Sequence, residues 1–307
     1  MTFTEQPLLV FDGACGTSLQ LMDISDKDWS GCEGCNEILN LSAPYHIIEF
    51  HKSMLDAGAM VIETDTFGAS RVVLAEYGLQ DKVKEVNTRA VENARLAIAG
   101  RTNKYIAGSV GPGTKLPSLG HISVADLAVA TREQIEALLE AGVDCLIVET
   151  CQDLLQTKTA LVAAFEVLET SNCQVPVMAS VTIEQQGTML VGSDIAAVVA
   201  VLEPFPLFSL GLNCATGPQD MTSHVKYLSQ NWPRRVSVIP NQGLPQVVNG
   251  QTHYPLSPEE YAEQMYQFVV HQGVSIVGGC CGTSPAHIAA LVKRLVGVTP
   301  GQREVSV

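Results

Sequence analysis

Short runs of apolar residues alternate along the chain with longer segments whose apolar positions recur at helical spacing. A nearly continuous apolar run is typical of a strand buried on both faces of a parallel sheet, whereas spacings of three and four residues are typical of helices that cover such a sheet. The pattern therefore predicts eight strands. We place them at residues 8–11, 59–62, 105–107, 145–148, 175–183, 207–214, 236–239 and 274–277.

A helix is predicted after each strand, and several of these helices carry signals at their ends. Ser123 is a candidate N-cap, and Ser257-Pro258-Glu259-Glu260 has the pattern of a capping box with proline in the first turn. Gly58 is the expected stop of the first of these helices. The predicted helices cover residues 44–57, 82–99, 123–141, 154–170, 194–202, 219–229, 257 onward and 285–296.

Eight successive strand–helix units indicate a single α/β domain, a (β/α)8 TIM barrel over residues 1–297. The count favours a closed barrel over an open doubly wound sheet, and no Gly-x-Gly-x-x-Gly motif follows the first strand. Residues 18–43 are a long, polar first βα loop, which we expect to pass over the mouth of the barrel. Residues 298–307 are expected to be a tail or the start of a linker.

The charge balance argues against two classes of partner. The 307 residues carry a formal net charge of -14, and nucleic acid and anionic membranes both select clustered Lys and Arg. The sequence shows no membrane-spanning apolar run and no signal-peptide pattern, so a cytoplasmic protein that binds a small molecule is expected. Nine cysteines in such a chain are expected to be reduced thiols rather than a disulfide framework.

Three cysteines are placed where two strands end. Cys280 and Cys281 follow the last strand among glycines, and Cys214 closes the sixth strand. Neighbouring residues on a strand point to opposite faces, so two adjacent thiols can face one ion only after the strand has ended. Three converging thiolates would hold Zn²⁺ and leave its fourth position open, and the alternative is three thiols that pack as small apolar side chains. Cys32 and Cys35 have metal-ligand spacing without a partner pair and are expected to be loop thiols.

Polar side chains also cluster at the predicted strand ends. Because the carboxyl ends of the strands build the active site of such a barrel, we expect these residues to bind a charged small molecule. Asp12 and Glu149 are the strongest candidates, and Glu63 and Asp65 either bind the ligand or support the backbone around it. No histidine ends a strand, which argues against a histidine base. The predicted substrate-binding residues are Asp12, Gly13, Ala14, Glu63, Glu149, Asn213 and Asn241.

Taken together, five motifs resemble those of the homocysteine S-methyltransferase family, and within it the N-terminal homocysteine-binding modules of cobalamin-dependent methionine synthases. The resemblance extends from Asp12 to Val296, with Cys15 and Asp65 departing from the family pattern. The motifs are Asp12-Gly13-Ala14-Cys15-Gly16-Thr17, Glu63-Thr64-Asp65-Thr66-Phe67, Gly211-Leu212-Asn213-Cys214, Pro240-Asn241-Gln242-Gly243-Leu244-Pro245 and Gly278-Gly279-Cys280-Cys281-Gly282-Thr283.

The resemblance implies a zinc-dependent enzyme that activates homocysteine as a zinc thiolate and methylates it, giving methionine. It implies that Cys214, Cys280 and Cys281 are the zinc ligands. It also implies that Asp12, Glu149 and the backbone of Gly13 and Ala14 hold the ammonium and carboxylate of the amino acid. Coordination suits this chemistry, because only a thiolate attacks carbon well and a free thiol is mostly protonated at neutral pH. Asn241 would either fill the fourth position before substrate arrives or orient a ligand.

The methyl donor is left open by the resemblance. The relatives that the chain resembles most use methylcobalamin, and other members use S-methylmethionine or betaine. The chain has no Asp-x-His-x-x-Gly cobalamin motif and no room for a folate module, so a corrinoid would have to arrive on another domain or protein. A noncatalytic zinc domain or corrinoid-partner domain is a further alternative.

Overall fold

Eight parallel strands form the centre of the computed structural model, which describes residues 1–248 and 251–305. The sheet has the order β1-β10-β7-β6-β5-β4-β3-β2. A bridge between Phe11 and Val61, together with a 2.7 Å hydrogen bond from the Met60 N–H to the Val10 carbonyl, joins its two ends. The predicted barrel is therefore confirmed. The strands are β1 (Leu9–Val10), β2 (Val61–Glu63), β3 (Tyr105–Val110), β4 (Cys145–Cys151), β5 (Val177–Val181), β6 (Ser209–Asn213), β7 (Arg235–Ile239) and β10 (Ile276–Val277).

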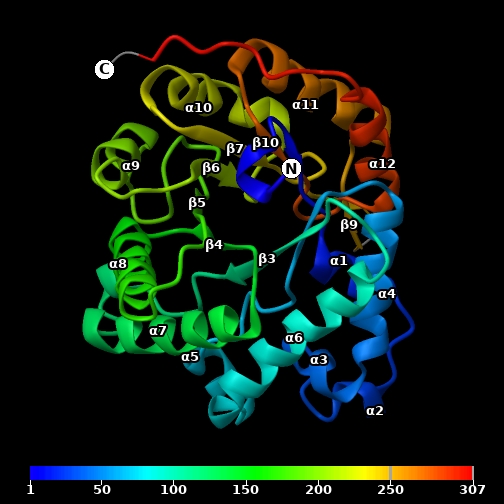
Figure 1. The fold of residues 1–307 in the computed structure, drawn as a ribbon, viewed down its shortest axis with the longest axis vertical. Coiled ribbons are helices and arrows are strands. Elements are labelled where there is room, and N and C mark those ends of the chain that lie inside the picture. Colours follow the sequence, from blue (N-terminus) through cyan, green and yellow to red (C-terminus); the bar gives the residue numbers. More distant parts are fainter. Residues whose placement is uncertain (249–250, 306–307) are drawn as a thin grey trace.

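A ring of helices surrounds this sheet (Figure 1). Their ends agree with the predicted ones to within a few residues, because local caps fix them. Ser123 accepts a hydrogen bond from the Asp126 N–H at 3.0 Å, and Ser257 forms the predicted capping box with Glu260. The helices are α4 (Pro44–Asp56), α6 (Val83–Ile98), α7 (Val124–Ala141), α8 (Leu154–Thr170), α9 (Ile195–Leu202), α10 (Pro218–Asn231), α11 (Pro258–Gln272) and α12 (Pro285–Arg294).

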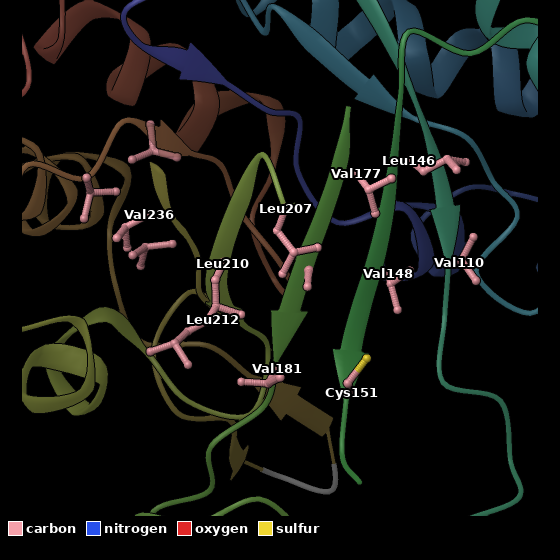
Figure 2. Packing of buried hydrophobic residues seen from close by; sticks show 14 of the residues in the cluster. Val110, Leu146, Val148, Cys151, Val177, Val181, Leu207, Leu210, Leu212 and Val236 are labelled. Carbon is pink, nitrogen blue, oxygen red and sulfur yellow. The ribbon is translucent and has the colours of Figure 1, made fainter. Parts of the chain in front are cut away.

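Two apolar layers explain why the strands read as continuous apolar runs. On β4, Leu146 and Val148 belong to the layer between sheet and helices, whereas Cys145 and Ile147 belong to a second cluster made chiefly of strand residues inside the barrel. Figure 2 shows the outer layer, including Leu210 and other side chains of neighbouring strands. Because both faces of each strand are buried, the period-two alternation of polar and apolar residues is lost.

The first βα segment is more structured than the polar loop that we predicted at residues 18–43. It contains the short helices α1 (Cys15–Gln20), α2 (Asp26–Trp29) and α3 (Leu39–Ser42). Leu19, Ile38 and Leu39 pack with Ile47 of α4 in a small apolar cluster of their own. Cys35 lies outside the helices and strands, as expected of a loop thiol, and its side chain is buried in that cluster.

Two other features were not predicted. An antiparallel hairpin of β8 (Gln246–Val248) and β9 (Gln251–His253) lies between β7 and α11. The segment expected to be a tail or linker is bonded to the barrel as far as it is described, because Gly301 donates to Val269 at 2.9 Å and the Arg303 guanidinium donates to the Trp232 carbonyl at 3.1 Å. Among the described residues, no helix combines the length and apolar character needed to cross a membrane.

Candidate active site

The three strand-end thiols converge at the carboxyl edge of the barrel. The Cys214 and Cys281 sulfurs are 3.8 Å apart, those of Cys280 and Cys281 are 3.9 Å apart, and all three lie within 4.8 Å of one another. Zinc–thiolate bonds of about 2.3 Å at tetrahedral angles place sulfurs about 3.8 Å apart, which matches the two distances that involve Cys281, so this donor set fits zinc. Over residues 1–248 and 251–305, no other cluster of three His, Cys, Asp or Glu side chains meets this test.

Backbone contacts hold the two cysteine loops together. The loop after β7 lies between them, because the Cys214 N–H donates to Ile239 at 3.2 Å and the Cys280 N–H donates to Pro240 at 2.8 Å. A third backbone hydrogen bond, from the Gln242 N–H to the Cys281 carbonyl at 2.9 Å, also joins the loop after β7 to the cysteine pair. Cys214 itself has φ +59°, a left-handed conformation that ends β6 abruptly and turns the thiol into the mouth of the barrel.

The glycines that frame the cysteine pair are required by close packing. A Cβ at Gly279 would lie 2.6 Å from the Thr283 Cβ and would also meet the Thr283 hydroxyl, which donates to the Cys280 carbonyl at 2.6 Å. Gly282 has φ +82°, which other residues rarely adopt. The glycines therefore allow the chain to turn tightly enough to present two adjacent thiols on one side.

The thiols influence one another strongly. Hydrogen bonds from Cys214 and Cys280 lower the pKa of Cys281, whereas hydrogen bonds to Cys214 and Cys281 raise the pKa of Cys280. The ionisation of any one of these thiols therefore depends on the protonation of the other two. A divalent cation would supply the positive charge that three thiolates need, and its binding would release protons.

A cavity of about 260 Å³ opens beside the thiols. It is smaller than a typical drug site and has the scale of an amino-acid ligand. No lysine or arginine is among the residues that line it. One part of its wall holds the three cysteines with Asp12, Glu63 and Glu149, and another part holds Cys15, Asn36, Glu37, Asp65 and Phe67.

Three carboxyl groups meet in the first part of the wall. Burial raises the pKa of Asp12, Glu63 and Glu149, and the charge of Glu149 adds to the rise at the other two. Asp12 accepts a hydrogen bond from the Glu63 N–H at 3.1 Å, and Ser109 donates its hydroxyl to Glu149 at 2.6 Å. Buried like charges without a protein cation favour a positively charged ligand, so this group can hold an ammonium.

Asn213 lines the cavity, but its amide is already bonded. The oxygen accepts from the Thr150 N–H at 2.9 Å and from the Ser180 hydroxyl at 2.8 Å. The amide nitrogen donates to Glu149 at 3.1 Å and to the Thr150 hydroxyl at 2.7 Å. The geometry therefore gives Asn213 the means to orient Glu149 rather than a free group for a ligand.

Two other predicted residues also differ in their surroundings. Gly13 and Ala14 both line the cavity, but the Ala14 N–H already donates to the carbonyl and the hydroxyl of Thr283, at 3.3 and 3.2 Å. Asn241 is 4% exposed and is not part of that wall. Its side-chain oxygen has no hydrogen-bond partner within the described part of the chain, although it lies on the loop that braces the thiols.

The second part of the wall was mostly not predicted from the sequence. Glu37 and Asp65 are buried, with the pKa of each raised chiefly by desolvation. Glu37 accepts from the Gly68 N–H at 2.5 Å, and Asp65 accepts from the Asn40 amide at 3.1 Å. Glu37 comes from the long first segment and does not end a strand, so the strand-end rule that found the other acids could not find it. These bonds make Glu37 and Asp65 supports of the surrounding backbone.

Comparisons with known proteins agree with this arrangement. A family model described as homocysteine S-methyltransferase matches residues 9–295. The chain is 41% identical over 305 residues to methionine synthase from Mycobacterium tuberculosis, and 42% identical over 310 residues to methionine synthase from Mycobacterium leprae. Each alignment covers 98% of this chain and 26% of the relative, so the chain spans about a quarter of the length of these proteins.

A solved structure gives a match over nearly its whole length. The metallated form of the homocysteine methyltransferase MmuM from Escherichia coli superposes with a TM-score of 0.75 at 27% identity, covering 94% of this chain and 97% of that chain. Its oxidized form gives a TM-score of 0.74 at 26% identity.

Proposed function

The chain belongs to the homocysteine S-methyltransferase family, and from that premise we propose that it binds homocysteine through its sulfur and transfers a methyl group to that sulfur, giving methionine. The observation that carries the proposal is the spacing of the Cys214, Cys280 and Cys281 sulfurs beside a cavity lined with acids. Zinc held by these thiolates would lower the pKa of a coordinated thiol, which supplies the nucleophile at neutral pH.

The acids beside the thiols are proposed to bind the amino-acid end of homocysteine. Asp12, Glu63 and Glu149 present buried carboxyl groups to the cavity, and an ammonium would relieve their mutual repulsion. Backbone groups of Gly13 and Ala14 are the proposed contacts of the substrate carboxylate. Ala14 would have to give up its hydrogen bonds to Thr283 for that role, which makes Gly13 the better placed of the two.

Asn241 is proposed to hold the metal's fourth position before homocysteine binds. Support comes from its buried side-chain oxygen, which lacks a hydrogen-bond partner in the described residues. An unpaired buried carbonyl oxygen is costly unless something binds it, and amide oxygens can coordinate cations. Homocysteine sulfur would then displace this oxygen.

Methylcobalamin carried on another domain or protein is the donor that we propose. The family resemblance supports it, and so does the finding that the relatives are methionine synthases about four times as long as the matched region. A second candidate is a small cationic donor such as S-methylmethionine or betaine. The absence of lysine and arginine from a cavity wall with five carboxyl groups favours a cation there, and the MmuM match is to a protein of similar length.

Metal analysis, homocysteine titration and donor exchange test the proposal together. The purified chain should contain about one zinc, and Cys281→Ser should lose both zinc and methyl transfer. Cys173→Ser is the matched control, because Cys173 is a free thiol outside the cavity wall. A metal-free preparation with full activity would exclude the zinc proposal, and a zinc-loaded protein that gives no heat with homocysteine would indicate the noncatalytic alternative. Assays with each donor, with and without a methylated corrinoid protein, separate the two donor classes.

We also propose a cytoplasmic location. All nine cysteines are free, which fits a reducing compartment.

A further inference from the structure

Strand β4 contains one extra residue where it reaches the cavity. Val148 of β4 pairs with Ala179 of β5. The next pair along the two strands is Cys151 with Val181, so three steps along β4 match two steps along β5. Thr150 lies within this bulge and has φ +55°, a left-handed conformation that a β-branched residue rarely adopts. A bulge of this kind redirects the side chains beside it.

The bulge presents two consecutive side chains to the cavity. In a regular strand alternate residues share a face, so Ile147, Glu149 and Cys151 would all point into the barrel. Ile147 does belong to the inner cluster, whereas Cys151 belongs with Val148 to the outer layer (Figure 2). The strand therefore changes face between Ile147 and Cys151, and Glu149 and Thr150 both line the cavity.

Hydrogen bonds join the Thr150 hydroxyl to the carboxyl group beside it. The hydroxyl accepts from the Asn213 amide at 2.7 Å and donates to one Glu149 oxygen at 3.3 Å. That oxygen also accepts from Asn213 at 3.1 Å, and the second Glu149 oxygen accepts from the Ser109 hydroxyl at 2.6 Å. The Glu149 carboxyl group is therefore held by donors from β3, β4 and β6.

These donors prepare Glu149 for a cation. Burial raises the pKa of Glu149, and hydrogen bonds from Ser109 and Thr150 oppose that rise because they favour the ionised form. An ammonium both carries positive charge and donates hydrogen bonds, so it binds an ionised carboxylate in a fixed orientation better than a neutral acid that rotates. A left-handed threonine persists only where the surrounding contacts maintain it, and such residues are concentrated at functional sites.

We propose that Thr150 is a positioning residue that makes the cavity selective for a thiol bearing an α-ammonium group. Its hydroxyl holds Glu149 in the orientation that receives the ammonium, and the bulge places that hydroxyl on the same side of β4 as the carboxyl group. A thiol without the ammonium gains nothing from this arrangement. The inference rests on the proposed function, in which Glu149 binds the ammonium of homocysteine, and adds to it a residue that sets selectivity at that end of the substrate.

Titration of the cobalt(II)-substituted chain with two thiols tests the proposal. Homocysteine and 4-mercaptobutanoate differ only in the α-amino group, and coordination of either sulfur is followed in the sulfur-to-cobalt charge-transfer band. Thr150→Val is nearly isosteric and removes the hydroxyl, so we expect the Kd of homocysteine to rise about tenfold and that of 4-mercaptobutanoate to change by less than about twofold. Thr150→Ser keeps the hydroxyl and should bring the Kd of homocysteine back to within about threefold of the unsubstituted value.

Thr170→Val is the matched control. Thr170 is exposed at the end of α8, and its hydroxyl donates to the Glu166 carbonyl of the same helix at 2.9 Å. This variant should bind both thiols as the unsubstituted chain does. Equal losses for both thiols in Thr150→Val would overturn the proposal, because they would indicate general damage to the site. Unchanged homocysteine binding, or a loss that Thr150→Ser does not restore, would overturn it as well.

Thr150→Gly keeps the test decisive if Thr150→Val does not fold. Glycine adopts the left-handed conformation without strain, so this variant keeps the bulge and removes only the side chain. It should bind homocysteine about tenfold more weakly than the unsubstituted chain, and normal binding would contradict the proposal. The two levels of failure are distinguishable. If the unsubstituted chain binds homocysteine no more tightly than 4-mercaptobutanoate, the proposed ammonium site fails, whereas selective binding that survives in Thr150→Val refutes only the role of Thr150.

Discussion

The side-chain amide of Asn213 donates a 3.1 Å hydrogen bond to the carboxyl group of Glu149. Asn213 is the last residue of β6 and immediately precedes Cys214, whereas Glu149 lies on β4. The residues proposed to bind the sulfur and the ammonium of homocysteine are therefore connected through the side-chain amide of Asn213. The same amide holds Thr150, whose φ of +55° bends β4 beneath the cavity.

Asn213→Ala should weaken homocysteine binding more than zinc binding. The change leaves the Thr150 N–H and the Ser180 hydroxyl without their acceptor and frees Glu149 to rotate. We expect a loss of about 1–3 kcal/mol in stability and about a tenfold rise in the dissociation constant of homocysteine. Titration calorimetry and chelator competition measure the two affinities. Asn231→Ala, at the end of α10, is the control, and a loss of zinc as large as the loss of homocysteine would contradict the expectation.

Glu63→Gln should stabilise the ligand-free protein at neutral pH while weakening homocysteine binding. Burial raises the pKa of Glu63 above its value in the unfolded chain, so the folded state retains a proton that the unfolded state has already lost. Stability is therefore greatest below the unfolded pKa of about 4 and falls as the pH rises toward the raised value, by about 1.4 kcal/mol for each pH unit between the two pKa values. The glutamine cannot ionise and removes this loss.

Thermal melts at pH 5 and pH 8 test whether the stability lost through Glu63 increases with pH. The difference in free energy of unfolding between Glu63→Gln and the unsubstituted chain should be larger at pH 8 than at pH 5. A matched change on the surface, Glu136→Gln on α7, should show no such dependence. Equal stabilisation at both pH values would mean that the carboxyl group of Glu63 does not resist ionisation.

The fold was predictable because strands that are buried on both faces appear in the sequence as continuous apolar runs. Runs such as Cys145 to Val148 are apolar at every position, and caps such as Ser123 and Ser257 are local signals that need no tertiary information. The small cluster around Leu39 was missed because it joins residues as far apart as Leu19 and Val83, and the β8–β9 hairpin was missed because each of its strands has only three residues. Short elements of this kind carry too few residues to show a period.

The site was predictable only where it follows the strand-end rule. Cys214, Cys280, Asp12 and Glu149 lie at or near the carboxyl ends of strands, and the structure brings them to one cavity. The rule cannot tell a group that faces a ligand from one that holds a neighbour. Asn213 therefore looked like a binding residue, although its amide is bonded to protein groups at both ends.

Gly279→Ala should disable the metal centre. Its Cβ would lie 2.6 Å from the Thr283 Cβ and would displace the hydroxyl that bonds the Cys280 carbonyl. We expect at least a tenfold loss of zinc affinity with secondary structure retained, measured by chelator competition and circular dichroism. Gly100→Ala is the control, because Gly100 has φ +80° but nothing near its Cβ, so only a backbone cost of about 1 kcal/mol is expected there. Unchanged zinc affinity in Gly279→Ala would contradict the packing argument.

Asn241→Ala should lower zinc affinity only when homocysteine is absent. The buried Asn241 oxygen has no hydrogen-bond partner in the described residues, and its loop bonds both cysteine loops. If this oxygen completes the metal's coordination in the resting protein, removing it should weaken zinc binding about ten- to a hundredfold, since an unmade bond to a charged group costs about 1.5–3 kcal/mol. Homocysteine would supply the fourth ligand itself, so zinc affinity measured at saturating homocysteine should return to that of the unsubstituted chain. Chelator competition with and without homocysteine separates the two states, and an equal loss in both would show that Asn241 supports the loop instead of contacting the metal.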